Sequence, residues 1–135
     1  DFFPPQQFNS SVQNFINQHI NQNMDPNSCD GVIKQRKISK AYSNKCKKEN
    51  TFISATYGEV TKVCGDEGEP YEINNRSLRI SREKFTVVNC KCNDNLTFDY
   101  CGCKGSRPNL RIVIDCDNNG NPVHYQEGVN IPTYE

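Results

Sequence analysis

The sequence predicts an α+β domain, with helices in the first part of the chain and antiparallel strands in the second. An apolar stripe with helical spacing lies near the start, and alternating or β-branched segments follow from residue 77 onward. The 135 residues include eight cysteines, an even number that is typical of small domains stabilised by disulfides. The length suits one core and no linker or repeat is visible, so residues 1–135 are predicted to form a single domain.

The first predicted element is a helix that ends at the turn residues 25–28. A second, basic helix is predicted over residues 31–39. Residues 51–63 are ambiguous, because the start of this segment favours a strand whereas residues 57–63 favour a helix. The stripe of the first helix falls at i, i+3, i+4, i+7 and i+8, on Val12, Phe15, Ile16, His19 and Ile20.

The second half of the chain is predicted to consist of strands joined by turns. Runs rich in Asn, Asp, Gly and Pro separate segments that alternate or carry β-branched side chains. The predicted strands are residues 77–81, 85–91, 96–103, 110–115 and 123–125.

Composition indicates how the domain is stabilised and where it works. Hydrophobic residues make up 34% of the chain, the mean hydropathy is −0.82, and tryptophan is absent. Disulfides worth about 2–4 kcal/mol each would offset this shortage of apolar material, and they imply an oxidising compartment. No apolar run is long enough to cross a membrane. The opening Asp-Phe-Phe-Pro-Pro predicts a mature chain whose signal has been removed, and glycosylation triplets begin at Asn9, Asn75 and Asn95, so we expect a secreted glycoprotein.

The charges are balanced overall but unevenly distributed. The formal net charge is zero, so bulk charge does not indicate a nucleic-acid partner. A basic strip between residues 34 and 48 could nevertheless hold phosphates, or it could be a solvated surface without a ligand. The strip has no acidic residue, and its seven basic residues are Lys34, Arg36, Lys37, Lys40, Lys45, Lys47 and Lys48.

The two histidines are the side chains whose ordinary pKa best suits acid–base work near neutral pH. His19 lies on the apolar face of the first predicted helix, and His124 lies on the last predicted strand. Each alone fits a structural role better than a catalytic one, so the pair matters only if the fold brings both together. Lys47 follows Cys46, and a disulfide at Cys46 would fix the backbone of the lysine.

Three motifs resemble the pancreatic ribonuclease superfamily, which includes ribonuclease A and angiogenin. Residues 46–52 read Cys-Lys-Lys-Glu-Asn-Thr-Phe and match the family signature C-K-x-x-N-T-F. Gln18-His19 resembles the first catalytic histidine of the family with its preceding glutamine, and Pro122-Val123-His124-Tyr125 resembles the second. The motifs occur in the family's order, and the resemblance covers residues 12–129. It implies N-terminal helices packed on a curved antiparallel sheet.

The resemblance also implies a cysteine pairing. The three bridges common in the family correspond to Cys29–Cys90, Cys46–Cys101 and Cys64–Cys116. The family's usual fourth bridge follows the position of Cys64, where this chain, like angiogenin, has no cysteine. Cys92 and Cys103 lie two residues beyond Cys90 and Cys101, so antiparallel neighbouring strands would place them opposite each other for a fourth bridge. A metal site is the rival interpretation of the two Cys-x-Cys pairs, although their spacing differs from the usual zinc patterns.

The activity implied by the resemblance is cleavage of single-stranded RNA 3′ of pyrimidines, through a 2′,3′-cyclic phosphate that is then hydrolysed. RNA supplies its own 2′-hydroxyl nucleophile, and neither a metal nor a cofactor is expected. His19 would act as the base, His124 as the acid and Lys47 as the charge stabiliser. The substrate-binding residues implied are Gln18 at the phosphate, Thr51 and Tyr125 at the pyrimidine, Asp117 at the next base, and Asn50 of the signature.

Departures from the family pattern predict modest turnover. Gln126 stands where the family has an aspartate that orients the second histidine, and an amide brings no charge. Asn14 and Asn17 stand where the pancreatic enzyme has basic residues that contact an outer phosphate. We therefore consider the basic strip as a substitute for that contact.

Two other functions fit the same motifs. One is an angiogenin-like signalling factor with weak or dispensable catalysis, which would bind heparin-like polyanions or a cell-surface receptor. The run Lys34-Gln35-Arg36-Lys37 resembles the basic segment that angiogenin uses for nuclear entry. The other is a host-defence protein that acts on bacterial membranes, which a net charge of zero disfavours. In each case we expect a monomer without stable membrane insertion.

Overall fold

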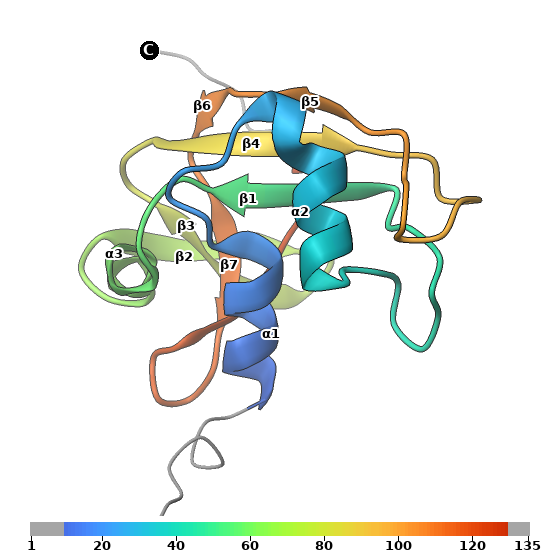
Figure 1. The fold of residues 1–135 in the computed structure, drawn as a ribbon. Coiled ribbons are helices and arrows are strands. Elements are labelled where there is room, and N and C mark those ends of the chain that lie inside the picture. Colours follow the sequence, from blue (N-terminus) through green and yellow to red (C-terminus); the bar gives the residue numbers. More distant parts are fainter. Residues whose placement is uncertain (1–9, 130–135) are drawn as a thin grey trace, which may run out of the picture.

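A computed structural model describes residues 10–129 and has the α+β architecture that the sequence predicts (Figure 1). The helical elements are α1 (Ser10–His19), the 3-10 turn η2 (Pro26–Ser28), α2 (Cys29–Arg36), α3 (Tyr57–Thr61) and the 3-10 turn η3 (Lys62–Cys64). The strands are β1 (Glu49–Ile53), β2 (Gly68–Ile73), β3 (Arg76–Ser81), β4 (Phe85–Lys91), β5 (Lys104–Ser106), β6 (Asn109–Leu110), β7 (Val113–Cys116) and β8 (Pro122–Tyr125).

The strands form two antiparallel sheets. In one sheet the order is β1-β4-β5, with β6 also paired to β4, and in the other the order is β2-β3-β7-β8. The chain passes from the first sheet to the second between β6 and β7, which divides the single strand predicted over residues 110–115 into two. Figure 1 shows α1 and α2 lying together on one side of these strands.

Strands β1 and β4 separate two hydrophobic cores. Phe52 pairs with Val88, and both side chains point into a core that also contains Ile33 of α2. The next pair, Ile53 with Val87, points the opposite way into a core that contains Phe15 of α1. This is the alternation expected along a strand, and it explains why both helices are anchored to the same strand pair.

All eight cysteines form disulfides, which are Cys29–Cys90, Cys46–Cys101, Cys64–Cys116 and Cys92–Cys103. These are the four pairs expected from the sequence. The last pair continues the β4–β5 register, in which Lys91 lies opposite Lys104. Its Cα atoms are 4.0 Å apart, just beyond the ends of both strands.

Both predictions for the ambiguous segment 51–63 are confirmed, the strand at its start and the helix that follows. The segment is a strand until Ile53 and then forms α3. A capping box begins this helix, since the Thr56 hydroxyl accepts from the Glu59 N–H at 3.0 Å and the Glu59 carboxylate accepts from the Thr56 N–H at 2.8 Å.

Two strand predictions were wrong. Strand β2 was missed, because Glu69, Pro70 and Glu72 disfavour strands; pairing with β3 forms it nonetheless. Residues 96–103, predicted as a strand, form successive turns, in which the Leu96 and Tyr100 N–H groups donate to carbonyls three residues earlier. The strand in this region starts only at Lys104.

Asn75 and Asn95, which begin two of the glycosylation triplets, are exposed in turns, whereas Asn9 lies outside the described residues. Within residues 10–129, no helix combines the length and apolar character needed to span a lipid bilayer.

Candidate active site

His19 is the last residue of α1, and the chain that follows fixes its position. Ile20 forms a parallel bridge with Ile53, and the Asn21 N–H donates to the Ile53 carbonyl at 3.1 Å, which fastens the end of α1 to β1. The Nδ1 atom of His19 lies 2.8 Å from the Thr51 carbonyl oxygen. A carbonyl can only accept, so Nδ1 carries the proton and Nε2 keeps its lone pair. This is the tautomer that a general base requires.

The surroundings of His19 keep its ring neutral. The side chain is 5% exposed and lies between the rings of Phe15 and Tyr125, with each centroid 5.3 Å away. Burial lowers the pKa of His19 to about 3, and the positive charges of Lys47 and, to a smaller extent, His124 act in the same direction. A phosphate anion beside these cations would oppose the electrostatic part of this shift, so substrate should bring the pKa back towards the neutral range.

Lys47 is held by the residues around it. The disulfide of Cys46, together with the bond from the Cys46 N–H to the Leu96 carbonyl at 2.8 Å, fixes the backbone beside the lysine. The Lys47 Nζ donates to Gln18 Oε1 at 3.1 Å and to Asn50 Oδ1 at 2.9 Å. Asn50 is buried and donates in turn to the Gln18 carbonyl at 2.8 Å. Lysine, glutamine and asparagine therefore form one network, and partial burial lowers the pKa of Lys47.

His124 is exposed on β8, opposite Asp115 of β7. Partial burial and the positive charge of Arg76 lower its pKa, while the Asp115 carboxylate opposes them. The Gln126 Oε1 accepts from Arg76 Nη1 at 2.9 Å. Arg76, which also lies 4.0 Å from an oxygen of Asp115, thus occupies a position near His124 that sequence reasoning missed.

The three predicted catalytic side chains come from distant parts of the chain and meet in one place. α1 contacts both β1 and β8, and Tyr125, the neighbour of His124, stacks on His19. Lys47 donates to Gln18, the residue before His19, at 3.1 Å, and its charge lowers the pKa of both histidines. Two imidazoles and an ammonium group so arranged can move two protons around a phosphate and stabilise its charge.

The predicted pyrimidine site holds an unexpected carboxylate. The Thr51 N–H and Oγ1–H donate to the two carboxylate oxygens of Glu127 at 2.8 and 2.6 Å. The same hydroxyl oxygen accepts from Asn89 Nδ2 at 2.8 Å. Burial raises the pKa of Glu127, although both Thr51 bonds favour its charged form. The groups proposed to read the base are therefore already engaged.

The remaining predicted site residues, Tyr125 and Asp117, make contacts that support the fold. Tyr125 is buried against His19 and lines a hollow of about 190 Å³ together with Thr51 and Glu127. The Asp117 Oδ1 accepts from the N–H groups of Asn119 and Asn121, both at 2.9 Å, which shapes the turn before β8.

Known proteins resemble this chain over most of its length. Residues 10–126 match the family described as pancreatic ribonuclease. The chain belongs to this family. Similar relatives of this ribonuclease include ribonuclease-like 3 of Danio rerio, at 32% identity over 93% of this chain and 83% of the relative. The pancreatic ribonuclease of Iguana iguana is 35% identical over 83% of this chain and 92% of its own. Angiogenin of Macaca mulatta is 32% identical over 93% and 84%.

Solved structures give the same result. The X-ray structure of zebrafish RNase5 covers 94% of this ribonuclease and all of its own chain, with a TM-score of 0.80 and 38% identity. Green turtle egg white ribonuclease covers 90% and 100%, with a TM-score of 0.74 and 27% identity. The chain is thus a pancreatic-type ribonuclease with the fold of its relatives.

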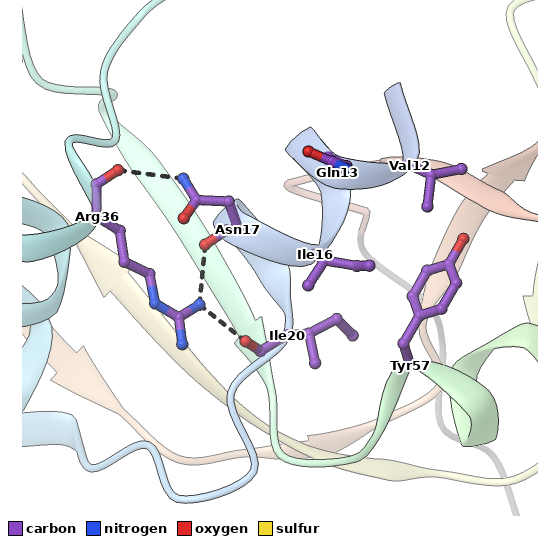
Figure 2. Close-up of a pocket in the computed structure, with 7 residues that line it drawn as sticks. All are labelled: Val12, Gln13, Ile16, Asn17, Ile20, Arg36 and Tyr57. Carbon is purple, nitrogen blue, oxygen red and sulfur yellow. Dashed lines mark hydrogen bonds between the residues drawn. The ribbon is translucent and has the colours of Figure 1, made fainter. Parts of the chain in front are cut away.

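Part of the basic strip serves the fold of this ribonuclease. Arg36 Nη1 donates to the carbonyls of Asn17 at 2.9 Å and Ile20 at 2.8 Å, and Asn17 Nδ2 donates back to the Arg36 carbonyl at 3.1 Å (Figure 2). The guanidinium also lies 5.9 Å from the centre of the Phe52 ring. Arg36 therefore joins α2 to α1, and it lines an apolar hollow of about 560 Å³. These contacts engage an arginine of the segment that resembles a nuclear-entry motif.

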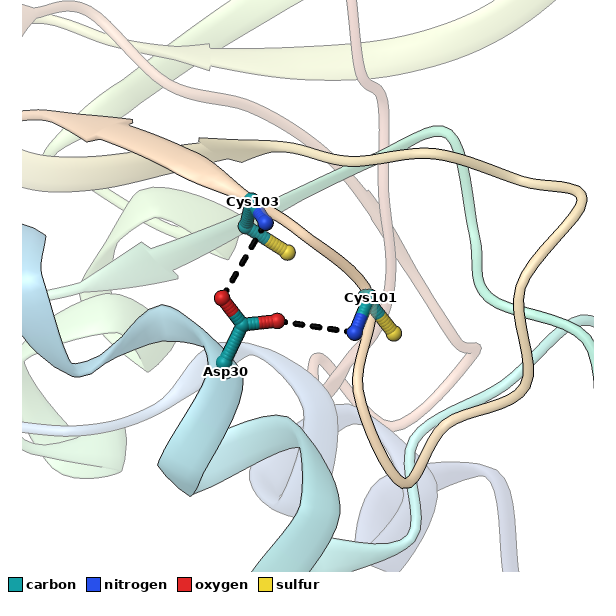
Figure 3. Close-up of side chains that lie close together, drawn as sticks. All are labelled: Asp30, Cys101 and Cys103. Carbon is teal, nitrogen blue, oxygen red and sulfur yellow. Dashed lines mark hydrogen bonds between the residues drawn. The ribbon is translucent and has the colours of Figure 1, made fainter.

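Asp30, Cys101 and Cys103 lie close enough to suggest a metal site, but each has another partner (Figure 3). The Asp30 carboxylate accepts from the Cys101 N–H at 2.8 Å and the Cys103 N–H at 3.1 Å. Both sulfurs are in disulfides, so neither is a thiolate that could bind zinc. The cluster fixes the backbone between two bridges.

Proposed function

We propose that this chain is a single ribonuclease domain that cleaves single-stranded RNA 3′ of pyrimidines, with His19 as base and His124 as acid. The observation that carries this proposal is the bond between His19 Nδ1 and the Thr51 carbonyl at 2.8 Å. It leaves Nε2 free to take a proton, and it places the proposed base beside the residue proposed to bind the pyrimidine.

The proposed reaction has two steps. His19 Nε2 takes the proton of the 2′-hydroxyl while the 2′-oxygen attacks phosphorus. The bond from phosphorus to the 5′-oxygen breaks, and protonated His124 gives its proton to that oxygen, which leaves a 2′,3′-cyclic phosphate. Water then opens the ring with the two histidines in reversed roles. DNA lacks the attacking hydroxyl and should resist.

The remaining polar groups have supporting roles in this proposal. Lys47 and Gln18, which already hydrogen-bond each other at 3.1 Å, would stabilise the charge on the phosphoryl oxygens, with Asn50 orienting both. Thr51 offers an N–H and a hydroxyl to the base, Tyr125 supports it from the same hollow, and Asp117 would contact the following base.

The position of Glu127 supports modest activity, since substrate must displace its carboxylate from Thr51. This observation favours, as a second candidate, an angiogenin-like factor for which slow catalysis suffices and which binds heparin-like polyanions or a receptor. The lack of a cysteine directly after Cys64 supports a place near the angiogenin-like members, whereas the Cys92–Cys103 bridge is not typical of the family. Disulfides at all eight cysteines favour secretion.

Cleavage of uridylyl-3′,5′-adenosine by the wild type, His19→Ala and His124→Ala, made in the same host, tests the proposal. We expect wild-type cleavage and a loss of several orders of magnitude in both variants, with the cyclic phosphate as the first product. Equal activity in all three proteins would show contamination or another mechanism and would refute the assignment.

A further inference from the structure

A third hollow, of about 700 Å³, adjoins the proposed reaction centre. The catalytic-site residues Gln18 and Lys47 line it, together with Lys40, Tyr42 and Lys48. Asn14 of α1 also lines it. We call this hollow the Tyr42 groove. None of the roles proposed above for the catalytic and base-binding residues accounts for it.

Tyr42 is the most unusual residue of the groove. Its side chain is fully exposed to solvent, so it adds no buried contact to the fold. Its φ of 59° lies in the left-handed region, which aromatic residues seldom adopt. Hydrogen bonds at the base of the loop hold this shape, since Ser39 Oγ donates to the Ser43 carbonyl at 2.8 Å and the Lys40 N–H donates to the Lys45 carbonyl at 2.9 Å. An aromatic ring is thus presented to solvent on an ordered loop.

The charges around Tyr42 favour an anion. Lys48 is exposed. Lys40 pairs with Asp94 at 3.4 Å, but both side chains are more than two-fifths exposed, so exchanging this partner for a phosphate costs little. The acid that lines the groove, Glu49, accepts from Asn89 Nδ2 at 2.7 Å. Although the protein has no net charge, this surface is locally cationic.

An exposed aromatic ring beside exposed lysines is the combination that binds single-stranded nucleic acid, because bases stack on the ring and phosphates meet the ammonium groups. We propose that the Tyr42 groove binds a nucleotide of the RNA outside the cleaved dinucleotide, with its base on Tyr42 and a flanking phosphate on Lys40 and Lys48. The proposal rests on the proposed ribonuclease function for the identity of the ligand. The groove would then select long RNA over dinucleotides.

Binding can be tested without cleavage by titrating a fluorescently labelled oligodeoxyadenylate, which this chemistry cannot cut. We expect Tyr42→Ala to raise Kd about tenfold and Tyr42→Phe to bind like the wild type. Lys40→Ala/Lys48→Ala should flatten the dependence of log K on log salt by about 0.7 for each phosphate that is no longer neutralised. Matched controls are Tyr100→Ala, another exposed tyrosine, and Lys84→Ala/Lys104→Ala, which removes the same charge elsewhere. All these side chains are exposed, and thermal melts would verify folding.

Catalysis gives a second measurement. The ratio of kcat/KM on an oligoribonucleotide to that on uridylyl-3′,5′-adenosine should fall several-fold in Tyr42→Ala and stay constant in Tyr100→Ala. The stacking site is refuted if Tyr42→Ala changes neither this ratio nor Kd. It is also refuted if Lys40→Ala/Lys48→Ala weakens the binding of a heparin fragment and of the oligonucleotide equally while Tyr42→Ala has no effect. Failure of the wild type to cut either RNA would refute the proposed function instead, and a Tyr42-dependent Kd would still support the groove.

Discussion

Removing the Glu127 carboxylate should increase RNA cleavage, because it frees both Thr51 donors. Hydrogen bonds to a charged acceptor contribute about 1.5–3 kcal/mol each, and Glu127 accepts two, at 2.8 and 2.6 Å. Burial of the carboxylate, which raises its pKa, opposes this gain. If the two bonds together stabilise the blocked state by a net free energy of about 2 kcal/mol, Thr51 would be free in about 3% of molecules. Glu127→Ala should then raise kcat/KM about 10- to 30-fold. Glu127→Gln should give a smaller increase, since an amide has one acceptor oxygen.

The assay is steady-state cleavage of uridylyl-3′,5′-adenosine, with Glu83→Ala as the control for loss of an exposed acid. The rise in kcat/KM should come mainly from a lower KM, because the carboxylate competes with the base for the same donors. In a Thr51→Ala background Glu127→Ala should have a smaller effect, because only the backbone N–H bond at 2.8 Å is left to release. An unchanged or lower kcat/KM for Glu127→Ala, or a full increase without the Thr51 hydroxyl, would refute the reasoning.

Three further predictions follow from the surroundings of the histidines and from the fourth disulfide. The folded-state pKa of His19 is lowered to about 3 from its ordinary value of 6.5; stability is therefore present above pH 6.5 and lost as pH falls towards 3, at up to about 1.4 kcal/mol per pH unit. Urea unfolding should show this slope, and His19→Ala should flatten it; an equal slope in both would contradict the assignment. Arg76→Ala should raise the pKa of His124 in an NMR titration and move the alkaline limb of kcat/KM upward, since it removes a positive charge; an unchanged pKa would exclude Arg76 as a cause. Cys92→Ser/Cys103→Ser opens a loop closed across a sequence separation of 11 and should lower the free energy of unfolding by about 3 kcal/mol; a loss below about 1 kcal/mol would contradict the chain-entropy argument.

The parts of the fold that depend on local chemistry could be predicted from the sequence. The apolar stripe of α1 places Phe15 and His19 on its buried face, as the spacing indicates. The signature at residues 46–52 identifies Lys47 beside a disulfide, and the ambiguous segment after it contains its own capping box at Thr56 and Glu59. These features need few long-range contacts.

The features that could not be predicted depend on contacts between distant segments. Strand β2 has unfavourable residues and forms through its pairing with β3. Arg36 belongs to the basic strip in the sequence, yet its guanidinium binds carbonyls at the end of α1. Glu127 is 76 residues from Thr51 and contacts it only because β8 ends beside β1. Nothing near residue 127 in the sequence indicates this partner.

The Asp30 carboxylate has a consequence for oxidative folding. Cys90 and Cys92 have the same Cys-x-Cys spacing as Cys101 and Cys103. A shift of two residues between these two segments would therefore exchange the partners of the disulfides. Asp30 accepts from the N–H groups of both Cys101 and Cys103, and its neighbour Cys29 binds Cys90. Once the Cys29–Cys90 bridge is closed, these two bonds favour the native alignment of residues 101–103 over one shifted by two residues. We therefore expect loss of the Asp30 carboxylate to increase the share of scrambled disulfide isomers on oxidative refolding.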